Sequence, residues 1–235
     1  MSGIIVLVGG EEFSPDFSEV HKHILSFIQS SSPKIVFFPT AASSEGIEVV
    51  NKWSNIAINN LSVLGTRVNI AKVIDMESAN SPEYSEMVED ADVIYLGGGL
   101  PDVYFSILQN TKVWDSVVSA HKQGKMIIGA SAGAMILGEQ TLYAEFQGDY
   151  PPSHWGKGFN VLPNVGIAPH YNTFPKTWIA KIKKNLPANM NLLGIDEKTA
   201  LIKQNNIWKV KGEASVSVFF NGQETTFNSG DEIEF

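Results

Sequence analysis

The chain has 235 residues, of which 43% are hydrophobic and 18% charged, and this composition suits one α/β domain with a sizeable core. The net charge of -8 argues against non-specific nucleic-acid binding, which depends on a basic face, and the lack of cysteine excludes disulfides, thiolate metal sites and a cysteine nucleophile. No basic segment precedes the first apolar stretch, and no apolar run reaches about 18 residues. We therefore expect a cytoplasmic protein without membrane or nucleic-acid partners.

The first helix follows an aliphatic run at residues 4–8, which is typical of a strand buried on both faces of a parallel sheet. It begins near Ser14, because a proline stands at the next position. His21 and His23 lie on this helix two residues apart, on different faces, so a metal pair is not expected. We expect both histidines to lie on the surface.

Hydroxyl side chains follow the second predicted strand, residues 34–38. Thr40, Ser43 and Ser44 come at its carboxyl end, where ligands bind in open α/β sheets. They could line a site, although a helix cap or a polar loop explains them more simply.

Three consecutive glycines, residues 97–99, follow a predicted strand at residues 93–96, after a third strand near residues 68–74 and a helix that opens near Ser81. Such a run requires a backbone conformation that other residues resist. Two readings remain open: exposed N–H groups that receive an anion, or a tight turn before the helix at Pro101. A phosphate loop of the G-x-x-x-x-G-K-[ST] type is absent.

The most informative stretch is residues 125–137, where an apolar strand passes through Gly129-Ala130-Ser131-Ala132-Gly133 into a helix-forming segment. A serine between two glycines at a strand-to-helix turn is typical of a nucleophile elbow. Small neighbours permit the strained serine backbone, and the N–H of Ala132 would then face the space above the hydroxyl, where an oxyanion forms. A small-residue turn without chemistry is the alternative.

A histidine ends a short strand downstream of the elbow. Residues 140–146 could be extended and residues 147–160 form a predicted loop rich in glycine and proline, after which the strand leads to His170. A base at the carboxyl end of a strand would suit a serine nucleophile. Residues 174–186 predict a helix and residues 192–195 another strand.

The pattern changes near residue 200. Short strands are predicted at residues 200–203, 207–210, 216–220 and 225–227, with hairpin turns at Asn205-Asn206 and Asn221-Gly222. We expect a small antiparallel β unit that caps one edge of the parallel sheet. The whole chain, residues 1–235, is then one α/β domain, with about residues 200–235 as its β-hairpin extension.

These motifs together resemble family S51 of the serine peptidases, which contains peptidase E (aspartyl dipeptidase) and the cyanophycinases. The matching segments are the elbow 129–134, the glycines 97–99, the segment 158–163 that leads to Pro169-His170, and Gly194-Ile195-Asp196-Glu197-Lys198-Thr199-Ala200-Leu201. The resemblance implies a three-layer αβα fold with a mostly parallel sheet, like that of the class I glutamine amidotransferases, with serine in place of cysteine.

The resemblance also implies roles for individual residues. Ser131 would be the nucleophile and His170 the general base, and the N–H groups of Gly98 and Ala132 would form the oxyanion hole. The acid that orients the histidine is expected a little beyond the elbow helix, at Glu145 or Asp149.

Two further points concern the choice of acid. Glu139 ranks below Glu145 and Asp149, because it stands too near the end of the elbow helix. Asp196 and Glu197 are expected to be structural.

We therefore expect a serine exopeptidase that acts on dipeptides or short acidic peptides through an acyl-enzyme. No metal or cofactor is implied, and the oligomeric state, a homodimer included, is left open. In the resembling family, a preference for amino-terminal aspartate would suggest an arginine after the histidine. Here that region contains Lys176 and no arginine. The alternatives are a non-catalytic protein that binds a small molecule and an acyl esterase.

Overall fold

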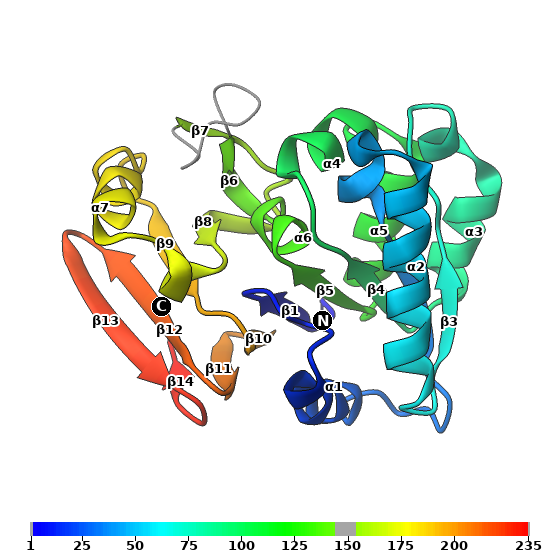
Figure 1. Ribbon diagram of the computed structural model, residues 1–235, viewed down its shortest axis with the longest axis horizontal. Helices are drawn as coiled ribbons and strands as arrows, with labels where there is room; N and C mark the ends of the chain where they lie inside the picture. Colours follow the sequence, from blue (N-terminus) through cyan, green and yellow to red (C-terminus); the bar gives the residue numbers. More distant parts are fainter. Residues whose placement is uncertain (1, 144–153, 235) are drawn as a thin grey trace.

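The computed structural model describes residues 2–143 and 154–234, and its larger sheet has eight strands in the order β14-β11-β10-β1-β5-β4-β2-β3 (Figure 1). Strands β1, β5, β4, β2 and β3 run parallel, and β10, β11 and β14 extend the sheet antiparallel beyond β1. The bounds are β1 Ile5–Val8, β2 Lys34–Phe38, β3 Arg67–Ile70, β4 Val93–Leu96, β5 Met126–Ala130, β10 Thr199–Gln204, β11 Ile207–Gly212 and β14 Glu232–Ile233.

Helices cover both faces of this sheet, because its central strands are apolar on both sides. Alternate residues of β1 point to opposite faces: Leu7 joins a cluster with side chains of α3, α4 and α5, and Val8 joins one with side chains of α1 and α2. The helices are α1 Ser18–Leu25, α2 Ile47–Ser62, α3 Pro82–Asp90, α4 Pro101–Leu108 and α5 Lys112–Lys122. The three layers confirm the αβα class expected from the sequence.

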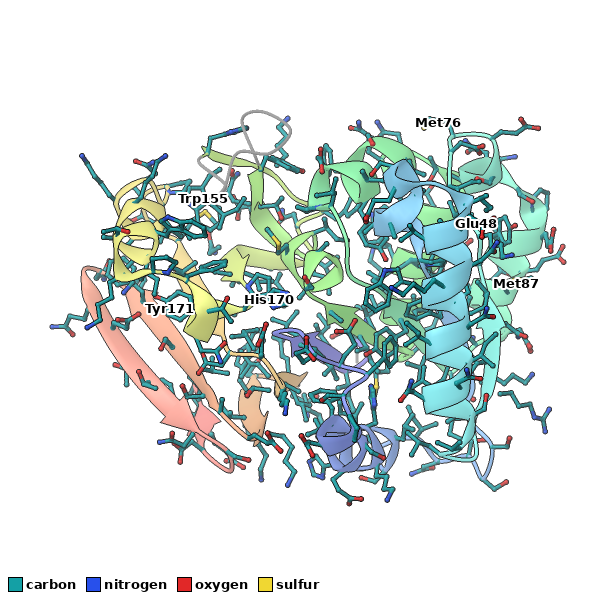
Figure 2. All side chains as sticks on the ribbon, viewed as in Figure 1. Glu48, Met76, Met87, Trp155, His170 and Tyr171 are labelled. Atoms are coloured by element: carbon teal, nitrogen blue, oxygen red, sulfur yellow. The ribbon has the colours of Figure 1, made fainter. Side chains whose placement is uncertain are left out.

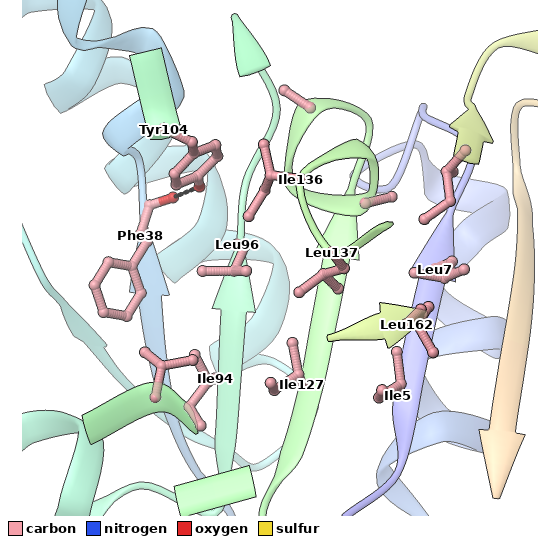
Figure 3. Packing of buried hydrophobic residues seen from close by; sticks show 14 of the residues in the cluster. Ile5, Leu7, Phe38, Ile94, Leu96, Tyr104, Ile127, Ile136, Leu137 and Leu162 are labelled. Atoms are coloured by element: carbon pink, nitrogen blue, oxygen red, sulfur yellow. Dashed lines mark hydrogen bonds between the residues drawn. The ribbon is translucent and has the colours of Figure 1, made fainter. Parts of the chain in front are cut away.

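A buried hydrogen bond stabilises the core together with the apolar contacts (Figure 3). The hydroxyl of Tyr104 on α4 donates to the carbonyl oxygen of Phe38 at 2.7 Å, and both residues are fully buried. This bond ties α4 to the carboxyl end of β2, beside the glycine turn that follows β4.

A second sheet of six strands stands beside the first, in the order β13-β12-β9-β8-β6-β7 (Figure 1). Its β6, β8 and β9 are parallel, and β7, β12 and β13 are antiparallel to their neighbours. The bounds are β6 Gly138–Tyr143, β7 His154–Lys157, β8 Leu162–Ala168, β9 Asn191–Ile195, β12 Ser215–Phe220 and β13 Gln223–Asn228, with helix α7 Lys176–Lys184. The antiparallel pairs expected after residue 200 are present, but they do not form one unit. Strands β10 and β11 belong to the larger sheet, and β12 and β13 belong to the smaller one.

Two local expectations were wrong. His21 is 3% exposed, not on the surface, because its ring packs edge-on against Phe17 and its Nε2 lies 3.2 Å from the hydroxyl of Tyr95. Residues 154–157, expected in a loop, form β7, because Gly156 lets the ring of Tyr143 lie against the strand backbone.

Among the described residues, no helix combines the length and the apolar character that crossing a membrane requires.

Candidate active site

Ser131 stands between β5 and the four-residue helix α6, Ala132–Met135, in a strained backbone conformation. Its φ of 50° and ψ of -115° fall outside the regions that L-residues prefer, at a cost of about 1–3 kcal/mol. Hydrogen bonds hold this backbone conformation on both sides of the residue. The N–H of Ser131 donates to the carbonyl oxygen of Val8 at 3.0 Å, and the carbonyl oxygen of Ser131 accepts from the N–H groups of Ala134 and Met135. This is the geometry expected of a nucleophile elbow.

The two glycines of the elbow are required by the backbones that pass beside them. A β-carbon on Gly129 would collide with the carbonyl of Gly133, and one on Gly133 would collide with the carbonyl of Leu96 on β4. Helix α6 can therefore approach the sheet only where these side chains are missing.

His170 approaches Ser131 from the other sheet. It follows β8 in the left-handed conformation, with φ 52°, and its N–H donates to the carbonyl of Gly9 at 2.7 Å. Its Nε2 lies 3.0 Å from the Oγ of Ser131. Gly10 makes room for the imidazole, because a β-carbon there would overlap the ring. In Figure 2 His170 lies between the elements of the eight-stranded sheet and those of the six-stranded sheet.

Glu197 contacts the opposite side of the imidazole. Its Oε1 lies 2.8 Å from the Nδ1 of His170, and both side chains are 30% exposed. The N–H of Glu197 donates to the side-chain oxygen of Asn172 at 3.0 Å, which joins the Glu197 turn to the segment after the histidine. Three side chains, Ser131, His170 and Glu197, thus form one hydrogen-bonded chain.

Glu197 was expected to be only structural, but it contacts the imidazole of His170. The structural role expected for Asp196 is confirmed. Asp196 accepts hydrogen bonds from the N–H and hydroxyl of Ser215 at 3.1 and 2.7 Å, and is 9% exposed. Glu139 accepts from the N–H of Asn164 instead. The other candidate acids, Glu145 and Asp149, lie outside the described residues.

A signal for Glu197 was present in the sequence. The segment 194–197 ends a predicted strand with two acidic residues, just as Pro169-His170 ends another. Because β8 and β9 are parallel neighbours, with Ala168 paired to Gly194, their carboxyl ends deliver His170 and Glu197 to the same point. The sequence did not show that these two strands are adjacent.

Gly98 and Ala132 flank the serine. The position that a β-carbon on Gly98 would take is 3.4 Å from the Cβ of Ser131 and 3.9 Å from its Oγ. In the described part of the chain, neither the N–H of Gly98 nor that of Ala132 has a hydrogen-bond partner. Two free N–H groups beside a nucleophile can hold an oxyanion.

The hydroxyls after β2 play no part in this chain of hydrogen bonds. Thr40 is fully buried at the start of the 3-10 turn Thr40–Glu45, where its hydroxyl has no partner in the described residues. Ser43 is half-buried and Ser44 exposed on the same turn. The segment instead supports the glycine turn, since the N–H of Leu100 donates to Ala41 at 2.9 Å.

Comparison with known proteins gives consistent results over nearly the whole chain. The model of peptidase family S51 matches residues 4–210. The crystal structure of a peptidase from an acI-B1 actinobacterium has a TM-score of 0.88 at 32% identity and covers 100% of this chain and 98% of its own.

Two curated sequences are also similar. An uncharacterized peptidase of Pasteurella multocida is 28% identical over 204 residues, which is 83% of this chain and 94% of that protein. A cyanophycinase of Geminocystis herdmanii is 22% identical over 238 residues, which is 97% of this chain and 84% of that protein. With the family model matched from the first strand to β11, this chain belongs to peptidase family S51 and is a serine-type peptidase.

Proposed function

We propose that the protein is a serine exopeptidase that hydrolyses dipeptides or short acidic peptides, with Ser131 as nucleophile, His170 as general base and Glu197 as the acid that orients the base. The observation that supports this most directly is the continuous hydrogen-bonded chain from the Oγ of Ser131 through both nitrogens of His170 to Glu197. Glu197 replaces Glu145 and Asp149 in the proposal because it contacts the imidazole.

The carboxylate of Glu197 sets the tautomer of the histidine. An ionised carboxylate can only accept hydrogen bonds. The Nδ1 of His170 therefore carries the hydrogen, and Nε2 presents its lone pair to the Ser131 hydroxyl. Nε2 can then take the hydroxyl proton as Oγ attacks the scissile carbonyl carbon, and Glu197 stabilises the imidazolium that forms.

The tetrahedral intermediate places a negative oxygen beside the serine. The N–H groups of Gly98 and Ala132 would hold it, because neither has a hydrogen-bond partner among the described residues and both residues are next to Ser131. When the C–N bond breaks, the imidazolium gives its proton to the leaving amine. His170 then takes a proton from a water molecule, which attacks the ester between the substrate acyl group and the Oγ of Ser131 and releases the free enzyme.

The test is turnover of dipeptides with aspartate, glutamate or alanine at the amino terminus, beside a matched amide and ester pair. Ser131→Ala should lower kcat/KM by about a thousandfold or more. Ser44→Ala, which alters an exposed serine outside the hydrogen-bonded chain, is the matched control and should retain activity.

Four outcomes would contradict the proposal in whole or in part. Equal turnover by wild type and Ser131→Ala would remove the nucleophile, and a failure of fluorophosphonate to label Ser131 would favour a protein that only binds its ligand. Turnover of the ester without the amide would point to an acyl esterase with the same triad. Activity on alanyl but not on aspartyl or glutamyl dipeptides would remove the acidic preference and leave the triad standing.

A further inference from the structure

A second carboxyl group, that of Glu12, is buried next to Ser131 and has no part in the proposed triad. It follows β1 by four residues and is 6% exposed. Gly10 with φ 127° and Glu11 with φ 56° turn the chain here, and the N–H of Ser14 closes the turn on the carbonyl of Glu11. Glu11 is left exposed while Glu12 is enclosed.

The carboxyl group of Glu12 and the hydroxyl of Ser131 both lie close to Gly98. The Oε1 of Glu12 and the Oγ of Ser131 each lie 3.9 Å from the position that a β-carbon on Gly98 would take. Because Gly98 has no side chain, a small group standing over it would contact both oxygens.

Among the described residues, the carboxyl group has no ion-pair partner. None of the ion pairs formed by the described residues includes Glu12. Burial raises the pKa of Glu12, an effect that its own backbone N–H and nearby His170 oppose and that Glu11 reinforces. A carboxylate enclosed without a counter-charge is unfavourable, so the site gains most from a ligand that brings a positive charge.

We propose that Glu12 receives the α-ammonium group of the residue whose carbonyl Ser131 attacks, so that the enzyme selects peptides with an unblocked amino terminus at that residue. This assignment rests on the proposed peptidase function. It makes Glu12 a specificity-determining residue of the same site.

The geometry of an amino acid favours the α-ammonium over a basic side chain. The α-nitrogen is two bonds from the carbonyl carbon, a separation of about 2.5 Å. When the carbonyl carbon is at Ser131 and its oxygen points toward the N–H of Gly98, the α-ammonium is near enough to reach the space over Gly98 that Glu12 borders. The charge of a lysine or arginine side chain would lie several bonds further away.

The assignment also explains how an exopeptidase could act without an arginine near the serine. Arg67 is the one arginine in the sequence, and it begins β3, at the opposite end of the parallel strands from the site. Recognition of a substrate end then depends on the carboxylate of Glu12 and a cation on the substrate, a charge-assisted hydrogen bond.

The experiment compares two substrates of nearly the same shape, alanyl-p-nitroanilide and lactyl-p-nitroanilide, in which a hydroxyl replaces the α-ammonium. The wild type should prefer the alanyl compound in kcat/KM. Glu12→Gln, which keeps the shape and removes the charge, should reduce that preference about tenfold to a hundredfold, mainly through KM. Glu12→Asp should restore part of it.

Glu11→Gln is the matched control, because it removes the same charge from the neighbouring exposed residue. It should change the preference by less than about threefold. A purely structural role for Glu12 would lower turnover of both substrates together and leave their ratio unchanged, and that result would overturn the assignment. So would a wild type that hydrolyses both compounds equally.

Failure of the assignment and failure of the peptidase proposal give different results. Turnover that depends on Ser131, with the same substrate ratio in wild type and Glu12→Gln, removes only the role of Glu12. Turnover that Ser131→Ala does not reduce removes both. If Glu12→Gln does not fold, as judged by circular dichroism, the ratio measured with Glu12→Asp decides: an unchanged ratio overturns the assignment and a lowered one supports it.

Discussion

The two sides of the candidate active site are held by different forces. On the side of the eight-stranded sheet, Ser131 is fixed by packing: its strand is buried throughout, and Gly129 and Gly133 let backbones touch where no side chain would fit. On the side of the six-stranded sheet, His170 and Glu197 are each 30% exposed and are fixed by hydrogen bonds, including those to Gly9 and Asn172.

This difference shows how the fold divides its tasks. A nucleophile with a strained backbone needs a rigid support, since its conformation costs free energy wherever neighbours permit relaxation. A base must change its protonation state during each turnover, and hydrogen-bonded side chains near solvent allow that. Apart from Ser131 itself, we therefore expect substitutions in the packed support of the first side to affect mainly stability, and substitutions of His170 or Glu197 on the second side to affect mainly chemistry.

Among the residues that support Ser131, the largest effect should come from the hydrogen-bonded side. Glu197→Gln should lower kcat about a thousandfold, because the neutral amide can hold the wrong tautomer of His170 and cannot stabilise the imidazolium. The free energy of unfolding, measured with urea, should change by less than about 1 kcal/mol, since the side chain is partly exposed.

Asp196→Asn is the control for that prediction and should behave in the opposite way. It weakens the hydrogen bonds to Ser215 and should cost about 1–2 kcal/mol of stability, while kcat stays within about threefold. Full activity in Glu197→Gln, with a larger loss in Glu145→Gln or Asp149→Asn, would return the acid to the segment first expected from the sequence.

The next effect tests the packed side. Gly133→Ala should destabilise the protein by about 3 kcal/mol, because the new methyl group collides with the backbone of Leu96 and both α6 and β4 are buried. Gly124→Ala is the control: its φ is 101° but nothing stands within 4 Å of the new carbon, so only about 1–2 kcal/mol of backbone strain is expected. Urea unfolding of both variants measures the difference, and equal costs would show that close packing does not hold the elbow.

The third effect, similar in size to the second, concerns helix α1, which packs on one face of the eight-stranded sheet. Burial lowers the pKa of His21 to about 4, from 6.5 in the unfolded chain. Stability that depends on the neutral ring is therefore complete above pH 6.5 and is lost as the pH falls toward 4, by on the order of 3 kcal/mol. Glutamine can keep the hydrogen bond to Tyr95 without titrating, so His21→Gln should lose less.

Urea unfolding between pH 7 and 4 measures this difference between wild type and His21→Gln. His154→Gln, which replaces an exposed histidine on β7, should follow the wild-type profile. If the wild type and His21→Gln lost stability in parallel, other groups would have to account for the acid sensitivity.

Much of the fold followed from local pattern. Apolar runs predicted β1, β2 and β4 closely, since strands buried on both faces need apolar residues at nearly every position. The elbow was predictable for the same local reason, because the serine and its two glycines stand within five residues. The contact between Ser131 and His170 required only that both stand at carboxyl ends of strands.

The sequence by itself therefore determined the αβα class, the turn that presents Ser131 and the choice of His170 as its partner. Only the tertiary structure decided that His21 is buried, that residues 154–157 pair as a strand, and that Glu197 and Glu12 come to the site. These outcomes depend on which strands lie side by side, and strand order is set by burial summed over the whole molecule, whereas a turn is set by the few residues within it.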